Sequence, residues 1–137
     1  MTIAAFLDSG AFIAFLDRSD RCHEDVKALF SRPPRSWAAS LLVVSETYSW
    51  MLHRLGEEPA RTFLGLLESL PQLQILTPDA AHHAAVLKKL QALRGTKLTY
   101  VDASSLVWLQ TKKIPKVWGT DHHLGVEGAA VVPGRVG

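Results

Sequence analysis

Short apolar runs alternate with longer amphipathic stretches along the whole chain. The runs of strand length are residues 2–7, 36–39, 73–77, 116–118 and 129–132. The stretches of helix length are residues 10–16, 23–30, 41–55, 58–70, 79–93 and 100–112. Parallel strands need long crossover connections, so helices between successive strands predict an α/β fold with a five-stranded, mostly parallel sheet flanked by helices.

Helix signals support this division of the chain. Thr77 followed by Pro78 is typical of a helix start, with a hydroxyl cap and a proline at the first helical position. Gly95 is expected to close the same helix. No repeat, low-complexity segment or linker interrupts the sequence. We therefore expect residues 1–137 to form a single domain.

Composition excludes several classes of protein. Of the 137 residues, 47% are hydrophobic and 20% charged, a balance typical of a globular chain rather than a disordered one. The net charge of +2 does not by itself indicate a nucleic-acid-binding protein. No run reaches the ~18 apolar residues of a membrane span, and the N-terminus lacks the basic residues of a secretory signal. With Cys22 as the one cysteine, these features predict a cytoplasmic protein with no membrane partner.

Four acidic residues stand in apolar surroundings. They are Asp8 after AAFL, Glu46 within LLVVSETYSWML, Asp102 within LTYVDASSLVWL and Asp121 after KVWGT. An isolated buried carboxylate is costly, so each must be neutralised, paired or bound to a cation. Basic residues close in sequence are too few for simple pairing.

Taken singly, each of these residues also has a structural interpretation. Asp8 and Asp121 follow strands and could cap helices. Asp102 lies three residues after Thr99, the spacing of a capping box. Glu46 could face solvent beside the polar side chains of its neighbours.

Taken together, the four carboxylates are expected to converge. Asp8 and Asp121 end strands, and the helix that begins before Asp102 must run antiparallel to them, which places its first turn at the same edge. Glu46 is in the second turn of the helix that leaves the second strand. Ligands can gather at this carboxyl edge of a parallel sheet. Four negative charges in one pocket require a cation, and oxygen ligands favour Mg²⁺, with Mn²⁺ as an alternative, over zinc.

The four acidic segments resemble the ordered motifs of the PIN-domain ribonucleases. The matching segments are LDSGAFIAFLD, the Ser45-Glu46 pair, LTYVDASSLV and VWGTDHHL, and the likeness is closest to the VapC-type toxins of toxin–antitoxin pairs. The resemblance implies strand order 3-2-1-4-5 and a Mg²⁺-dependent endoribonuclease whose acidic residues are Asp8, Glu46, Asp102 and Asp121. It further implies products with 5′-phosphate and 3′-hydroxyl ends, a homodimer and a cognate antitoxin.

Each acidic residue has an expected role. Asp8 and Asp102 are expected to bind the metal, and Asp121 to complete its ligand set directly or through water. Glu46 is expected to orient or deprotonate the attacking water, or to serve as a further ligand. Many relatives carry another Asp or Asn after the fourth acid, whereas here His122 and His123 follow, so one or two metals remain possible.

Further polar residues are candidates for contact with RNA or water. Thr120 matches the hydroxyl residue that usually lines the site, and Ser9 and Ser104 are expected to donate to substrate or bound water. Arg94 and Lys97 precede the Asp102 helix and are expected at the rim of the site, where they would offset its repulsion of RNA.

Histidine and tryptophan residues are given other roles. His82 and His83 are expected to be exposed, and His122 and His123 to contact substrate or pack locally rather than bind zinc. The four tryptophans, Trp37, Trp50, Trp108 and Trp118, are expected in the core or at a partner surface rather than as platforms for nucleobases.

Other classes of protein fit less well. A Mg²⁺-binding receiver module of a signalling system needs an adjacent acidic pair at the first site, but Leu7 precedes Asp8. A haloacid-dehalogenase-type phosphatase needs a second Asp two residues after the first, where Gly10 stands. A catalytically inactive PIN fold that acts only as a binding partner stays open.

Overall fold

The protein folds around one five-stranded sheet. The structure, a computed structural model, describes residues 2–133, and of His122 the backbone alone. The strands are β1 (Ala5–Leu7), β2 (Trp37–Ser40), β3 (Leu73–Leu76), β4 (Lys116–Gly119) and β5 (Ala130–Pro133). They lie in the order β3-β2-β1-β4-β5, and all four pairings are parallel. The predicted α/β class and the strand order are therefore confirmed.

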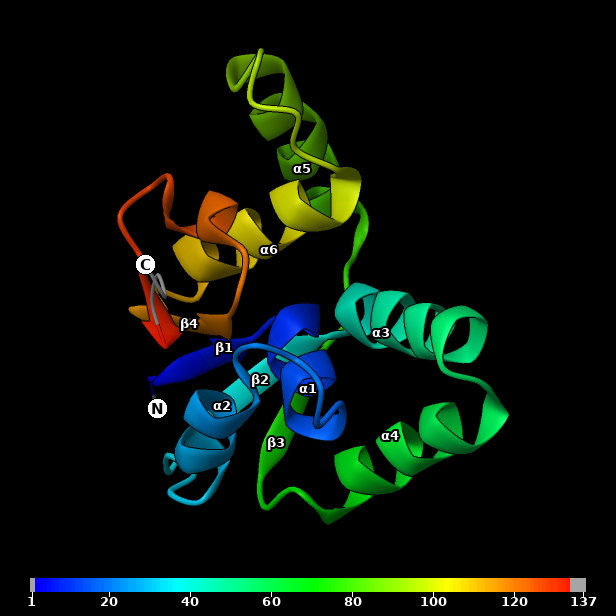
Figure 1. Cartoon of the computed structure of the whole chain (residues 1–137). Helices are drawn as coiled ribbons and strands as arrows, with labels where there is room; N and C mark the ends of the chain where they lie inside the picture. The colour runs from blue at the N-terminus through cyan, green and yellow to red at the C-terminus, as the bar shows by residue number, and fades with distance from the viewer. Residues whose placement is uncertain (1, 134–137) are drawn as a thin grey trace.

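Within residues 2–133, six helices pack on this sheet or on one another (Figure 1). They are α1 (Ser9–Leu16), α2 (His23–Phe30), α3 (Leu41–Arg54), α4 (Glu57–Ser69), α5 (Ala80–Ala92) and α6 (Tyr100–Thr111). All six lie within a few residues of their predicted positions. A 3₁₀ turn, η1 (His122–Gly125), follows β4 and was not predicted. No helix in the described part of the chain is both long and apolar enough to cross a bilayer.

The core lies between the central strands and the helices packed on them. The strands β1 and β2 are buried along their whole length, because parallel strands covered on both faces have no solvent side. Trp37 and Trp118 meet edge to face across the sheet, with ring centroids 5.5 Å apart. The helix α6 is buried continuously from Ala103 to Leu109. It is sandwiched, because Leu106 packs into the main core while Val107 packs with Val86 of α5.

The contact between α5 and α6 corrects two predictions. His82 is 6% exposed rather than solvent-facing, and its Nε2 lies 2.7 Å from the Ser104 hydroxyl. Its ring stacks on Trp108 with centroids 4.0 Å apart, and burial lowers the pKa of His82. Ser104 is completely buried and bonded to this ring, so the expectation that it donates to substrate is wrong. The cause is the docking of α5 along α6, which no local pattern encodes.

A separate correction concerns the start of α5. The helix is capped by Asp79 rather than by Thr77, and the Asp79 carboxylate accepts a hydrogen bond from the His82 backbone N–H at 2.8 Å. A carboxylate is as good a cap as a hydroxyl and also complements the positive end of the helix dipole, so the helix begins at Ala80.

Candidate active site

The strand order reverses between β1 and β4, and the acidic residues gather beyond this point. The chain builds outward from β1 to β3 and then returns to place β4 on the other side of β1. Asp8 follows β1, and its backbone N–H donates to the Trp118 carbonyl at 2.9 Å. Thr120 and Asp121 follow β4. Open α/β sheets form ligand-binding crevices at such reversals, because the connections on either side diverge there.

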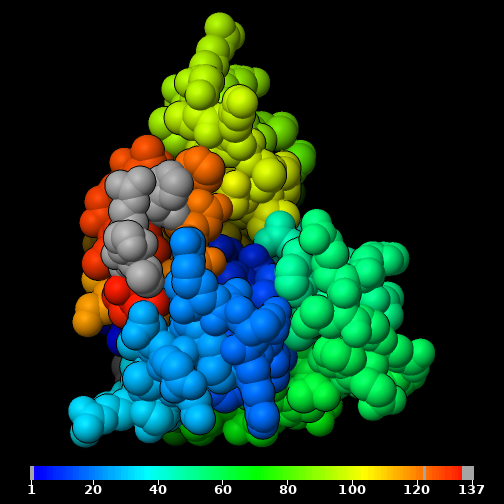
Figure 2. All heavy atoms as spheres, viewed as in Figure 1, coloured from blue at the N-terminus to red at the C-terminus, as the bar shows by residue number. Residues whose placement is uncertain are grey.

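Two helices bring the other two carboxylates to the same edge. Glu46 lies in the second turn of α3, and Asp102 in the first turn of α6. All four carboxylates line one cavity of about 400 Å³. The rest of its lining is Ser9, Gly10, Ile13, Trp50, Thr99 and Thr120. In Figure 2 the dark blue N-terminal segment is recessed between the yellow start of α6, the orange segment after β4 and the teal atoms of α3.

The carboxylates repel one another and are partly shielded from water. Burial raises the pKa of Asp8 to about 7, and the negative charges of Glu46, Asp102 and Asp121 act in the same direction. Burial likewise raises the pKa of Glu46, together with the charges of Asp102 and Asp121, although a hydrogen bond from the Ser9 hydroxyl opposes the rise. Asp8 is 4% exposed. Such a site is stabilised either by a proton or by a cation.

The capping interpretations have different outcomes for the three aspartates. Asp8 occupies the N-cap position of α1 but makes no side-chain capping bond. Asp102 completes a capping box with Thr99, in which Thr99 N–H donates to Asp102 Oδ2 at 3.2 Å. Asp121 caps η1 by accepting the His123 backbone N–H at 2.9 Å. Two of the four carboxylates therefore hold local structure and face the cavity as well, so the two interpretations are compatible.

Two of the carboxylates that line this cavity form a set of possible metal ligands with a nearby histidine. One ligand atom each from Asp102, Asp121 and His123 lie within 4.8 Å of one another. His123 Nδ1 is 3.0 Å from Asp121 Oδ1. Two neighbouring ligands of an octahedral ion with bonds of about 2.1 Å are themselves about 3 Å apart, so this pair could share one cation. The donor set fits a divalent metal.

The predicted RNA-contacting residues divide into two groups. Ser9 and Thr120 line the cavity. Arg94 and Lys97 are exposed in the segment between α5 and α6 and are not among the described residues that line it. That segment ends at Thr99, which does line it, so both cations lie on the chain leading to the rim.

Sequence reasoning missed other residues of the site. Trp50 lines the cavity, whereas the sequence predicts it in the core or at a partner surface. Its position four residues after Glu46 carried the signal, since residues four apart share a helix face. Ile13 had no comparable signal, because an apolar residue in an apolar helix predicts burial.

Gly10 allows α1 to approach the Thr120 loop closely. A β-carbon at Gly10 would overlap Thr120 Oγ1 and lie 3.0 Å from the Thr120 backbone nitrogen. We expect Gly10→Ala to lower the free energy of unfolding by about 1–3 kcal/mol, because the loop or the helix must move. Chemical denaturation measures this change.

Gly65→Ala is the matched control: its β-carbon meets nothing within 4 Å, and it should stabilise α4 by about 0.5–1 kcal/mol. Equal effects of the two substitutions would contradict the close packing at Gly10.

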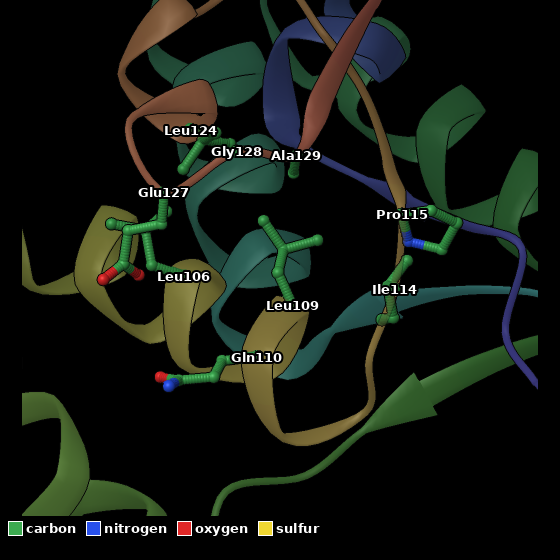
Figure 3. Close-up of a pocket in the computed structure, with 9 residues that line it drawn as sticks. All are labelled: Leu106, Leu109, Gln110, Ile114, Pro115, Leu124, Glu127, Gly128 and Ala129. Carbon is green, nitrogen blue, oxygen red and sulfur yellow. The ribbon is translucent and has the colours of Figure 1, made fainter.

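A second cavity, of about 460 Å³, lies elsewhere on the molecule (Figure 3). It lies between α6 and the segments that flank β4 and η1, and it is lined largely by apolar side chains such as Leu106, Leu109 and Ile114. Glu127 is the one carboxylate among the described residues that line it. Both of its oxygens accept hydrogen bonds from Lys89 Nζ, at 2.7 and 2.8 Å. Although this cavity is larger, the described residues that line it include no cluster of unpaired charged groups, so we place the candidate active site at the four carboxylates.

Comparison with known proteins agrees with this architecture. The structure resembles that of VapC20 of Mycobacterium tuberculosis, a sarcin–ricin loop cleaving toxin, with a TM-score of 0.85 and 20% identity over 93% of this chain and 97% of that one. FitAcB of Neisseria gonorrhoeae gives a TM-score of 0.67 at 19% identity, covering 93% and 95%. VapBC2 of Rickettsia felis, bound to a DNA fragment from its promoter, gives 0.64 at 11%, covering 94% and 96%. At these identities the likeness is one of fold.

At the level of sequence, no curated protein matches this chain. The family model of the PIN domain, however, matches residues 5–125. This span runs from β1 through η1 and contains all four carboxylates of the cavity. The chain therefore belongs to the PIN-domain family.

Proposed function

We propose that the protein is a metal-dependent endoribonuclease. Its catalytic centre for the hydrolysis of RNA phosphodiester bonds would be formed by Asp8, Glu46, Asp102 and Asp121. The observation that carries the proposal is the meeting of these four carboxylates, from four separate segments, around one cavity. Burial, and after it the charges of the other three carboxylates, raises the pKa of Asp8, so its charged form is unfavourable without a counter-charge. A site kept in this condition is typical of catalysis rather than of structural stabilisation.

Asp8, Asp102 and Asp121 are the proposed metal ligands, and His123 could add a nitrogen. Oxygen ligands favour Mg²⁺, while one imidazole in the set is equally compatible with Mn²⁺. Such an ion supplies Lewis-acid stabilisation of the charge that develops on the phosphate.

Glu46 is the proposed proton acceptor for the attacking water. Its raised pKa makes it a stronger base than an exposed glutamate, and the Ser9 hydroxyl holds its carboxylate in place. Thr120 lines the same cavity and is proposed to donate its hydroxyl to a phosphate oxygen. Arg94 and Lys97 are proposed to attract RNA toward the rim.

The fold also supports a biological setting. Its likeness to VapC20, VapBC2 and FitAcB, together with PIN-family membership, supports assignment as the toxin of a toxin–antitoxin pair. A cognate antitoxin and a homodimer are part of this proposal, as is a cytoplasmic location.

The test is cleavage of a mixed tRNA and rRNA pool by the purified protein. We expect cuts in the presence of Mg²⁺ or Mn²⁺, with 5′-phosphate and 3′-hydroxyl ends, and none after the metal is removed with EDTA. Sequencing libraries that capture only 5′-phosphates measure both the cuts and their chemistry. Cleavage that persists in EDTA, or that leaves 2′,3′-cyclic phosphates, would contradict metal-dependent hydrolysis.

A further inference from the structure

Trp50 differs from the other three tryptophans. Trp37, Trp108 and Trp118 are buried, with exposures of 0%, 8% and 6%, as the sequence led us to expect. Trp50 is half-buried: it packs against the hydrophobic core and also lines the cavity that holds the four carboxylates. A large aromatic ring is thus anchored beside the candidate catalytic centre.

Trp50 is the middle member of a row along α3. Glu46, Trp50 and Arg54 follow one another at intervals of four residues, so they share a helix face, with a rise of about 6 Å from each to the next. Arg54 completes the row, with its Cζ 5.9 Å from the centroid of the Trp50 ring. Figure 1 shows α3 running outward from the centre of the molecule. The row therefore leads from a carboxylate to an aromatic ring and then to a cation.

The charge of Arg54 is available to a ligand. Its side chain is exposed, and within residues 2–133 no carboxylate lies within ion-pair distance of it. A guanidinium binds phosphate through paired N–H donors, and it is attracted to the face of an aromatic ring beside it. An indole ring next to a free guanidinium matches the two parts of a nucleotide, its base and its phosphate.

We propose that Trp50 and Arg54 form a subsite for one unpaired nucleotide of the RNA, flanking the phosphate that is cut. The base stacks on Trp50 and the adjoining phosphate binds Arg54. Since every base has an aromatic face, this subsite selects single-stranded RNA over paired RNA but does not select a particular base. The inference rests on the proposed ribonuclease function and extends it to the recognition of substrate.

Binding is measured in the Asp102→Asn protein, so that RNA is not consumed. The probe is a random-sequence 12-nucleotide single-stranded RNA with a fluorescent label. Its binding is measured by fluorescence anisotropy in the presence of Mg²⁺. Adding Trp50→Leu should weaken binding about tenfold or more, because leucine retains an apolar side chain but cannot stack. Trp50→Phe should bind within a few-fold of the parent. Tryptophan fluorescence should be quenched by RNA in the parent and not in Trp50→Phe, which a purely structural role for Trp50 would not produce.

Arg54 is tested by the salt dependence of binding. Arg54→Gln should make the slope of log affinity against log salt shallower by about 0.7, the value for one phosphate contact on a single strand, whereas Arg54→Lys should keep it. Arg35→Gln removes the same charge from an exposed residue just before β2, at the opposite edge of the sheet, and should leave the slope unchanged.

Each outcome decides the inference. If Trp50→Leu binds like the parent, or if the 12-nucleotide RNA binds neither protein, the subsite is wrong even where the otherwise unaltered protein cuts RNA. If binding depends on Trp50 and Arg54 but no metal-dependent cleavage is found, the subsite stands and the ribonuclease proposal falls. A duplex of the same length that binds as tightly as the single strand would also overturn the subsite.

Discussion

Asp102→Asn should reduce RNA cleavage by about 100- to 1,000-fold or more while leaving the protein folded. The substitution removes one negative charge from the proposed metal ligands, and groups that stabilise transition-state charge contribute effects of this size. The amide oxygen of asparagine can still accept the hydrogen bond that Thr99 N–H donates to Asp102 Oδ2. The capping box of α6 should therefore persist, with a change in the free energy of unfolding below about 1 kcal/mol.

Asp79→Asn is the matched control for this experiment. Asp79 is also an aspartate that accepts a backbone N–H at a helix start, but it caps α5 and is absent from the lining of the carboxylate cavity. Cleavage rates and thermal unfolding are measured for both variants. Full activity in Asp102→Asn, or an equal loss in Asp79→Asn, would show that the carboxylate at position 102 has no specific catalytic role.

Asp8→Asn should abolish cleavage and yet stabilise the metal-free protein at neutral and higher pH. In the folded protein the pKa of Asp8 is about 7, compared with 3.8 for an ordinary aspartate. The folded state therefore holds the Asp8 proton more tightly than the unfolded state does. The resulting stability is fully present below about pH 4 and is lost as the pH rises through 7. The loss amounts to at most about 4 kcal/mol, from about three pKa units.

Urea unfolding in EDTA between pH 5 and 8 measures this effect. The stability advantage of Asp8→Asn over the parent should widen as the pH rises, because asparagine has no charge to bury. Added Mg²⁺ or Mn²⁺ should then stabilise the parent and have little effect on Asp8→Asn, since binding to the folded state alone shifts the unfolding equilibrium. A difference in stability between the two proteins that does not vary with pH would contradict the raised pKa of Asp8.

The periodicity of the sequence was sufficient to predict the class of fold. The alternation of apolar runs with amphipathic stretches predicted strands and helices within a few residues of those observed. The reason is that local hydrophobic periodicity indicates which segments form strands and which form helices. The strand order came from the likeness of four acidic motifs to the PIN domain, not from periodicity. The start of α5 shows where local signals failed, since Thr77 followed by Pro78 is a good start signal and yet Asp79 caps the helix.

The candidate site shows a similar division. Asp8, Glu46, Asp102 and Asp121 could be singled out because carboxylates in apolar segments are costly and need an explanation. Their distances, the link from Ser9 to Glu46 and the nearness of His123 to Asp121 depend on where distant segments pack. For Arg94 and Lys97 the sequence predicted only a position on the segment that leads to the rim. Where their exposed side chains lie cannot be read from hydrophobic periodicity, because that periodicity reports buried positions.

The sequence by itself thus determined that this chain alternates helices and strands. It also determined that four acidic residues stand in apolar segments, where an unpaired carboxylate is costly to bury. Only the tertiary structure decided that His82 is buried against Ser104 and Trp108, and that Trp50 lines the cavity of the carboxylates. The physical reason is that periodicity reports which face of a helix is apolar, whereas what that face meets depends on elements far away in the chain.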